Sequence, residues 1–385
     1  MKLDKEQFVK LLINRRISNV SKQLVKKISE CESDGSIAPN ADIVAQHKQK
    51  WGRIFKNEIN TGWLNWYIKK TGIQSPDFVP ENVFYTVIEP IINNSRFTVS
   101  YSDKNFYDLV YPKGLFPETL IRNIDGFYYD GNYKPLDLSN DEILLDTLAG
   151  AASVFVKPAT EAGGGRQVDL FVINGRKYLN KAGEELKLKF LDNVYKQSFV
   201  IQRTLCQHAF QAFFNPTSLN TIRVLTYRSP YTNQINILQS VFRIGAKNEF
   251  LDNSRAGGYS VGMDSQGKLN KFAIKKDGSK FDKVNDTNLV ENDYIIPFFE
   301  ELKAAAILIA EKNIHHRMLA LDMVIDENNH PRCVEVNNRS NEINFHQLNN
   351  GPLFGEFTDE IITYCEKHTE NLYKEFVITT IPFVP

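Results

Sequence analysis

Two neighbouring segments near the C-terminal end alternate between apolar and polar residues, which is the pattern of paired β-strands. In residues 319–326 the odd-numbered positions are all apolar, so Asp322 faces the other side. In residues 331–337 the valines share one face, and the opposite face belongs to three residues: Cys333, Glu335 and Asn337. The chain between the segments is short enough for a turn, so the sequence predicts a β-hairpin.

The register of this hairpin follows from the length of its loop. If residues 327–330 form a four-residue loop, Asp326 pairs with Pro331, and Asp322 then lies opposite Glu335. Two carboxylates ~4 Å apart repel each other by about 4 kcal/mol at an effective dielectric constant near 20. Such a pair requires a compensating positive charge.

A divalent cation would supply that charge. Magnesium prefers oxygen ligands from a couple of carboxylates together with nucleotide phosphates. We therefore predict a magnesium site at Asp322, Glu335 and Asn337, whose amide adds a neutral oxygen. The alternative is a solvated hairpin face on which the carboxylates pair with basic neighbours such as Arg317 or Arg339.

A glycine-rich segment lies between two further strands, 153–157 and 168–173. Three consecutive residues without side chains lie at its centre: Gly163, Gly164 and Gly165. Their N–H groups can approach phosphate oxygens, and Lys157 at the end of the first strand adds a positive charge. The segment is not a Walker A loop, which needs a closing Gly-Lys-Ser/Thr and a helix after it. We predict a phosphate-binding flap, with a flexible hairpin loop as the alternative.

The remaining pattern predicts an α+β fold. Other segments with β-branched and aromatic character are 199–205, 221–227 and 235–244. Helical spacing occurs at Lys2–Cys31 and at Phe298–Lys312, where Asn313 offers a stop. Prolines at 76, 80 and 90 predict a change of organisation within residues 74–95.

Composition excludes several classes of protein. The 385-residue chain has equal numbers of basic and acidic residues, which argues against a nucleic-acid partner. We interpret its four scattered cysteines as reduced core thiols: Cys31, Cys206, Cys333 and Cys365. No run of ~18 apolar residues is present. We therefore expect no membrane span and a cytoplasmic location.

Several motifs, taken in order, resemble the ATP-grasp superfamily. They are Lys157, the triple glycine, the strand 199–205 and the set Asp322, Glu335, Asn337, whose spacing is similar to that of D-alanine:D-alanine ligases. Four more segments look like the sugar-transfer-associated ATP-grasp family: 116–123, Gln207-His208, 215–224 and 253–258. This resemblance covers roughly residues 80–339.

The resemblance implies two α+β subdomains that clamp ATP, preceded by a mainly helical region. We expect the helical region at 1–95, the first lobe with the glycine loop at 96–205, the second lobe with the magnesium hairpin at 206–375, and a tail at 376–385. The expected cofactors are ATP and Mg²⁺.

The resemblance also assigns roles to individual residues. It implies that ATP is bound by Lys104, Lys157, Gly163, Gly164, Gly165, Gln202, Arg203 and Leu205. Gln202 stands where many relatives have a glutamate beside the adenine. The expected catalytic residues are Lys157 and Arg223. The guanidinium of Arg223 would face the γ-phosphate or a carboxylate. The alternative is that Arg223 is an exposed arginine on a strand. Expected substrate-binding residues are Asn220, Arg243, Arg255, Gly257, Gly258 and Arg339. We interpret His208, His315, His316 and His346 as mainly structural.

The resemblance favours an ADP-forming carboxylate–amine ligase that works through an acyl-phosphate. The family name suggests that a sugar carboxylate such as a hexuronate is joined to an amino acid or amine during cell-surface polysaccharide biosynthesis. Two alternatives remain open: a kinase acting on a sugar or polyol hydroxyl, and a non-catalytic nucleotide-binding module in an assembly complex. The sequence does not indicate an oligomeric state.

Overall fold

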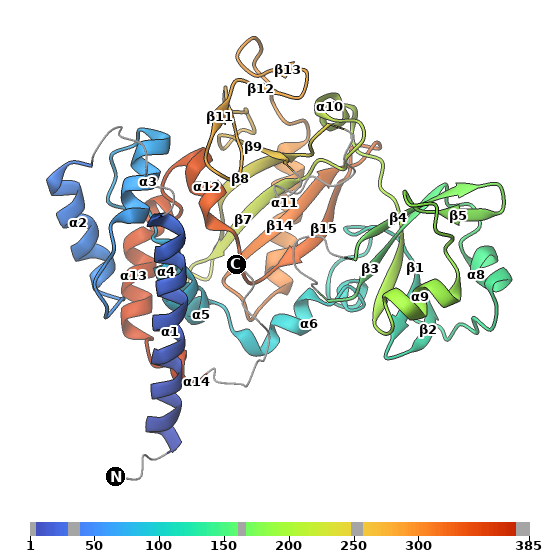
Figure 1. Ribbon diagram of the computed structural model, residues 1–385, viewed down its shortest axis with the longest axis horizontal. Coiled ribbons are helices and arrows are strands. Elements are labelled where there is room, and N and C mark those ends of the chain that lie inside the picture. Colours follow the sequence, from blue (N-terminus) through green and yellow to red (C-terminus); the bar gives the residue numbers. More distant parts are fainter. Residues whose placement is uncertain (1–4, 30–38, 161–166, 248–256, 375–385) are drawn as a thin grey trace.

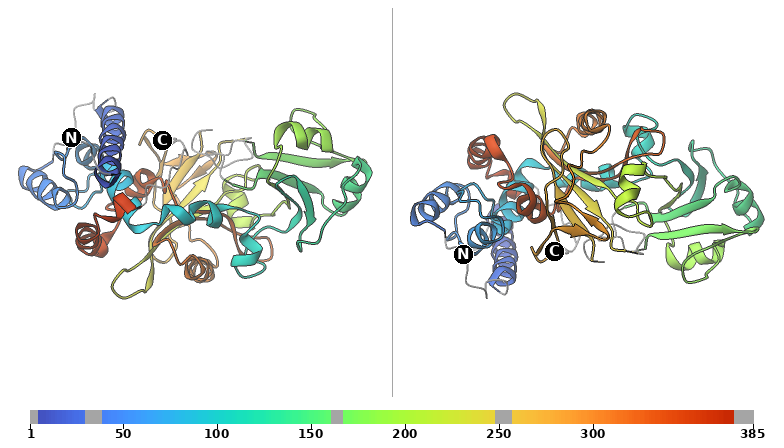
Figure 2. Two further views of the ribbon diagram at one scale, coloured as in Figure 1. Left: turned by 90° about the horizontal axis from the view of Figure 1, so that it is seen from below. Right: turned by 90° about the horizontal axis from the view of Figure 1, so that it is seen from above.

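The computed structural model describes residues 5–29, 39–160, 167–247 and 257–374. Three parts follow one another along the long axis of the molecule (Figures 1 and 2): a helical part, a central seven-stranded sheet and a smaller six-stranded sheet. Helices and antiparallel sheets are thus both present, and the α+β fold class with an N-terminal helical region is confirmed. Within the described residues, no helix has the length and apolar content needed to cross a lipid bilayer.

The helical part begins with three helices and a segmented fourth. Its elements are α1 (Lys5–Ser29), α2 (Ala41–Gly52), α3 (Gly62–Thr71), α4 (Glu81–Val83), the π-helical η1 (Phe84–Ile88) and α5 (Glu89–Ile92). Aromatic residues of α3 pack against one another and against Phe78, which stacks on Tyr67 with ring centroids 5.0 Å apart. The aromatic residues of this region therefore form core, as their spacing suggests.

Pro90 lies inside a helical run instead of ending it. Just before this proline the helix widens into the π turn η1, in which the N–H of Glu89 donates to the carbonyl of Phe84. Proline has no N–H, and its ring crowds the carbonyl four residues earlier, so a wider turn accommodates it. Pro76 and Pro80 lie in the non-helical segment between α3 and α4, as the predicted change of organisation in 74–95 requires, whereas the helix continues past Pro90 to Ile92.

The six-stranded sheet has the order β2-β1-β6-β3-β4-β5 and is antiparallel throughout. Its strands are β1 (Thr119–Ile124), β2 (Phe127–Asp130), β3 (Ser153–Pro158), β4 (Asp169–Asn174), β5 (Lys177–Leu179) and β6 (Phe199–Arg203). Residues of α8 (Asp141–Thr147) and α9 (Leu188–Val194) complete its hydrophobic core. All of these strands lie within the predicted first lobe, although its boundaries stay predictions.

The seven-stranded sheet has the order β11-β10-β9-β8-β7-β14-β15. Its strands are β7 (Ile222–Arg228), β8 (Ile235–Ile244), β9 (Tyr259–Gly262), β10 (Ala273–Ile274), β11 (Lys280–Phe281), β14 (Met318–Ile325) and β15 (Pro331–Asn337). A separate two-stranded ribbon is formed by β12 (Lys283–Val284) and β13 (Thr287–Asn288). The predicted strands at 221–227, 235–244, 319–326 and 331–337 all occur, and none of their ends is shifted by more than one residue.

Each face of the central sheet has its own core. One face packs on α11 (Phe299–Lys312), which ends at Asn313 as predicted. The other face packs on the N-terminal helices and on α13 (Thr358–Lys367), so residues such as Tyr227 and Ile361 belong to one cluster. The N-terminal helical part therefore shares a hydrophobic core with the second lobe.

Short helices complete the chain around the two sheets. Between the helical part and β1 lie η2 (Ser95–Phe97), α6 (Thr98–Ser102) and α7 (Tyr107–Val110). The second lobe adds α10 (Ala209–Phe214), α12 (Ile343–Asn350), η4 (Gly355–Phe357) and α14 (Asn371–Lys374). Helix α6 lies between the two sheets in Figure 1, and the chain that follows it brings Lys104 and Tyr107 to the edge of β15.

Candidate functional site

The hairpin of β14 and β15 places Asp322 directly opposite Glu335, which confirms the predicted pair. The turn begins one residue earlier than expected, because Ile325, and not Asp326, pairs with Pro331. A β-bulge between the Asp322 pair and the next one adds a residue to β15 and cancels this offset.

The bulge changes which face of β15 each residue occupies. Cys333 was expected beside Glu335, but it is buried in the same hydrophobic cluster as Val336. The bulge interrupts strict alternation at Val334, so Cys333 turns into the core. Burial raises the pKa of the Cys333 thiol well above its ordinary value, which keeps it protonated and inert.

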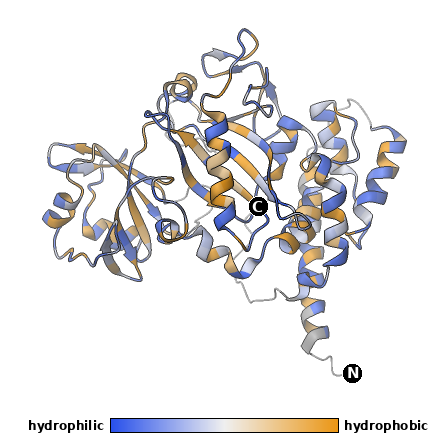
Figure 3. Ribbon diagram, turned by 180° about the vertical axis from the view of Figure 1, so that it is seen from behind, coloured by the Kyte–Doolittle hydropathy of each residue, from blue (hydrophilic) through white to orange (hydrophobic). Residues whose placement is uncertain are grey.

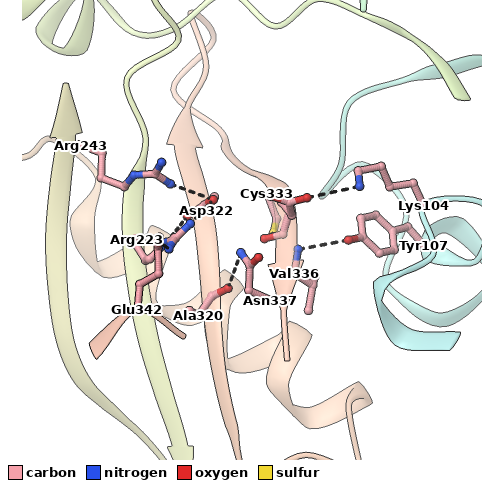
Figure 4. A network of polar contacts seen from close by, with 11 residues as sticks. Lys104, Tyr107, Arg223, Arg243, Ala320, Asp322, Cys333, Val336, Asn337 and Glu342 are labelled. Atoms are coloured by element: carbon pink, nitrogen blue, oxygen red, sulfur yellow. Dashed lines mark hydrogen bonds and ion pairs between the residues drawn. The ribbon is translucent and has the colours of Figure 1, made fainter. Parts of the chain in front are cut away.

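Two arginines hold the Asp322 carboxylate. Arg223 on β7 donates from Nε to Oδ1 at 2.6 Å and from Nη2 to Oδ2 at 2.8 Å, and Arg243 on β8 donates to Oδ2 at 3.0 Å (Figure 4). Burial raises the pKa of Asp322, but the charges and hydrogen bonds of both arginines outweigh it and bring the pKa to about 2. Arg317 and Arg339, the neighbours considered from sequence, are not its partners.

Arg223 is a buried residue of the central sheet and not an exposed strand arginine. Its side chain is 7% exposed, and its Nη1 also donates to Glu342 at 2.7 Å. Burial lowers its pKa, yet the nearby carboxylates, Asp322 first, raise the pKa above its ordinary value. The guanidinium is therefore a permanent charge, and the aromatic ring of Phe345 lies 5.5 Å away.

Two lysines lie near Glu335, and one of them forms an ion pair with it. The ammonium of Lys104 lies 3.3 Å from the Glu335 carboxylate, and its backbone N–H donates to Ala159, which follows β3. Lys157 is buried at the end of β3. Burial, with the charge of Lys104, lowers the pKa of Lys157 to about 8, while Glu335 opposes this shift. The predicted phosphate lysines and metal carboxylate thus come together.

Four of the predicted site residues lie outside the described residues, and three others lie within them. The four are the glycines Gly163, Gly164 and Gly165 and the substrate candidate Arg255. Gly257 is exposed with φ +84°, a conformation that favours glycine, and Gly258 beside it is buried. Arg339 is half-buried in the segment after β15. Their predicted roles stay predictions.

The strand β6 carries the candidates for adenine binding. Gln202 is buried there and donates from Nε2 to Thr119 at 3.2 Å, while its Oε1 has no hydrogen-bond partner in the described structure. The guanidinium of Arg203 donates to Glu118 at 2.6 Å and to a backbone carbonyl, and its predicted role in ATP binding stays a prediction. Leu205 is half-buried just after the strand.

Asn220 has a structural role in this protein. Its Nδ2 donates to the carbonyls of Gln211 and Asn215, and its Oδ1 accepts from Ser218 and Gly245. The side chain is fully buried, and its hydrogen-bonding capacity is used within the protein. These hydrogen bonds hold the segment that precedes β7, and hence Arg223, in place, and the predicted substrate-binding role of Asn220 stays a prediction.

The histidines divide into two kinds. His208 caps α10 by accepting from the N–H of Phe210, and His316 bonds Asn313. His315 stacks on Phe97. These three contacts agree with a structural interpretation.

His346 on α12 is different. It is fully buried, yet neither ring nitrogen has a hydrogen-bond partner in the described structure. Burial lowers its pKa to about 3, and Arg223 acts in the same direction. Its ring stacks on Phe345, which in turn lies beside the Arg223 guanidinium. Sequence alone groups His346 with the structural histidines, because only its place behind the charged cluster distinguishes it.

The oxygen atoms of the hairpin suit Mg²⁺. The side chain of Glu335 is 33% exposed, and Asn337 uses its Nδ2 on the carbonyl of Ala320, which leaves its Oδ1 as an acceptor. Among the described residues, no three His, Cys, Asp or Glu side chains gather as a complete metal cage. An ion here would need further oxygens from a phosphate ligand, as is usual for Mg²⁺.

Comparison with known proteins identifies a family. The family model described as sugar-transfer associated ATP-grasp matches residues 90–360. This range includes both large sheets and all the site candidates, but it leaves out α1, α2 and α3. A search of curated protein sequences finds no match.

Solved structures show only distant similarity. D-alanine–D-alanine ligase from Bacillus anthracis is 13% identical, with 71% of this chain and 68% of that protein covered and a TM-score of 0.35. The ATP-grasp ligase PsnB with a phosphomimetic variant of its minimal precursor, Mg and ADP is 12% identical, with coverages of 71% and 61% and a TM-score of 0.38. D-cycloserine synthetase DcsG is 11% identical, with coverages of 71% and 70% and a TM-score of 0.37.

Proposed function

Because the chain belongs to the sugar-transfer associated ATP-grasp family, we propose that it is an ADP-forming carboxylate–amine ligase. The observation that carries the proposal is the meeting of Lys104 and Lys157 with Glu335, next to the Asp322–Arg223 pair. Positive charges that suit phosphates and oxygen atoms that suit a metal ion are thereby adjacent.

In this proposal the two lysines bind the triphosphate. Lys104 leaves its ion pair with Glu335 and contacts phosphate oxygens, and Lys157 does so from the end of β3. Glu335, Asn337 and Asp322 would hold Mg²⁺, which when bound neutralises negative charge on the transferring phosphoryl group. Gln202, with its free Oε1, would accept from the adenine amino group.

Arg223 and Arg243 would stabilise charge that develops during the reaction. Both guanidinium groups are held in the sheet by Asp322, so their positions are set before substrates arrive. A buried guanidinium that stays charged at every working pH suits a transferring phosphoryl group or a carboxylate.

The proposed chemistry has two steps. A carboxylate oxygen of the first substrate attacks the γ-phosphorus, the bond to the bridging oxygen breaks, and ADP leaves. The amine then attacks the acyl carbon, a C–N bond forms, phosphate departs with the former carboxylate oxygen, and the amine loses a proton. The family description suggests a sugar carboxylate such as a hexuronate as the first substrate, in cell-surface polysaccharide biosynthesis.

Oxygen labelling tests this scheme directly. Purified protein is incubated with ATP, Mg²⁺, pooled ¹⁸O-carboxylate uronic acids and pooled amino acids, and products are analysed by mass spectrometry. We expect ADP, an amide and inorganic phosphate that carries one ¹⁸O, only when both substrates are present. AMP with pyrophosphate, or a phosphate ester formed without amine, would refute the ligase proposal.

A matched pair of variants tests the site. Glu335→Ala should abolish phosphate release, because it removes a metal ligand and the partner of Lys104. Glu327→Ala removes an exposed carboxylate from the turn of the same hairpin and should leave the rate unchanged. Equal rates of phosphate release by the two variants would mean that Glu335 does not bind the metal ion.

A further inference from the structure

Helix α1 is strongly basic in a chain without net charge. It has seven Lys or Arg residues and a single Glu, whereas the whole chain has 46 basic and 46 acidic residues. The helix lies outside the family match at 90–360, so the proposed ligase chemistry does not account for it.

One face of α1 is anchored to the protein. Ile13, Leu24 and Ile28 on this face are buried, with exposures of 8%, 2% and 1%. The latter two belong to the cluster that contains the aromatic residues of α3. Near the N-terminal end, the Lys10 ammonium lies 5.8 Å from the ring of Tyr373 on α14. The orientation of the helix is therefore set, and its opposite face is directed to solvent.

That opposite face carries a stripe with two apolar residues followed by basic residues. Phe8 is 50% exposed and Leu11 is 55% exposed. Arg15, Lys22 and Lys26 continue the same line at helical spacing, and all three are exposed. We call these five residues the α1 stripe. It is about 27 Å long at the rise of an α-helix.

The basic residues of the α1 stripe form no ion pair with the described residues of the protein. Within the part of the chain that the structure describes, no carboxylate pairs with Arg15, Lys22 or Lys26. Figures 1 and 3 show that the N-terminal turns of α1, which carry Phe8 and Leu11, project beyond the neighbouring helices. The apolar residues are thus placed at an outer end where a flat surface can reach them.

We propose that the α1 stripe docks the protein onto an anionic lipid bilayer. Unpaired cations along a straight helix complement a planar negative surface, and each adds about fivefold to the partition coefficient. Phe8 and Leu11 enter the boundary between headgroups and acyl chains, where apolar side chains of surface helices bind. The contact is peripheral and involves α1, which lies outside the residues of the proposed site.

Vesicle sedimentation tests the proposal. Full-length protein is mixed with vesicles of equal parts phosphatidylglycerol and phosphatidylcholine, or of phosphatidylcholine alone. We expect sedimentation only with the anionic vesicles, and release on addition of salt. The triple variant Arg15→Gln/Lys22→Gln/Lys26→Gln should lower the partition coefficient about a hundredfold. Phe8→Ser/Leu11→Ser should also weaken binding, and its remaining affinity should be more sensitive to salt.

A second triple variant provides the control. Lys113→Gln/Lys181→Gln/Lys276→Gln removes the same charge from exposed lysines elsewhere and should bind vesicles like the wild type. Circular dichroism checks that every variant is folded. Wild-type protein that stays in the supernatant with anionic vesicles overturns the proposal, and so does an equal loss in both triple variants. Neither result bears on the ligase assay, which contains no lipid.

Discussion

Replacing Asp322 with asparagine tests the centre of the site. In the folded protein the pKa of this carboxyl lies near 2 instead of 3.8, which corresponds to about 2 kcal/mol of stabilisation at neutral pH. The substitution also leaves Arg243 without this carboxylate, and breaking a buried ion pair costs about 3 kcal/mol or more. We therefore expect Asp322→Asn to lower the free energy of unfolding by about 3 kcal/mol.

The pH dependence separates this effect from a general loss of packing. Because the folded pKa is below the unfolded value, the stabilisation is complete above pH ~4 and is lost as the pH falls towards 2. Urea unfolding of both proteins at several pH values measures it. The gap between wild type and Asp322→Asn should narrow by about 2 kcal/mol over this range. A constant gap would refute the assigned role of Asp322, and Glu327→Gln serves as the exposed control.

Three other residues give further predictions. Lys157 has a pKa of about 8, so the affinity for Mg–ATP measured by calorimetry should weaken as the pH rises above 8. Lys157→Arg should remove this pH dependence. An affinity of the wild-type protein that does not change with pH would contradict the assignment. Gln202→Ala should weaken ATP binding about fivefold, which is the contribution of one hydrogen bond, and should weaken GTP binding less. Equal losses of affinity for ATP and GTP would exclude a contact with adenine. His346→Leu should raise the free energy of unfolding by about 1–2 kcal/mol, because it removes a buried imidazole without a hydrogen-bond partner in the described structure. The rate of phosphate release by this variant shows whether the imidazole takes part in the reaction. A lower free energy of unfolding would mean that the imidazole has a partner.

The pairing of Asp322 with Glu335 could be predicted because it depends on local periodicity. Alternation with period two sets the faces of β14, and one loop length sets the register. The predicted pair occurs although the turn starts at Asp326, because the bulge compensates for that shift. A single sequence carries no clear signal for a bulge, so strand alternation alone placed Cys333 on the face of Glu335, whereas its interpretation as a core thiol was correct.

The partners of Asp322 could not be predicted from local patterns. Arg223 and Arg243 are 99 and 79 residues away from it in the chain, and they meet it only because β7 lies between β14 and β8. Strand order in a sheet is a tertiary property, decided by burial on both faces of the sheet. The basic residues close in sequence, Arg317 and Arg339, were therefore the wrong candidates. Asn220 differs in this respect, because Gln211 and Asn215 are nine and five residues away from it and only Gly245, 25 residues away, is remote in sequence.

The charges of the site indicate how a nucleotide would be admitted. Four basic side chains meet three carboxylates in this cluster: Lys104, Lys157, Arg223 and Arg243 with Asp322, Glu335 and Glu342. The surplus positive charge favours a net negative ligand, and a magnesium–triphosphate complex has that charge. Its entry replaces ion pairs within the protein with ion pairs to phosphate and metal, so no buried charge loses its partner. Because Lys104 must leave Glu335 in this exchange, Lys104→Met should free the carboxylate and weaken ATP binding while retaining Mg²⁺ affinity.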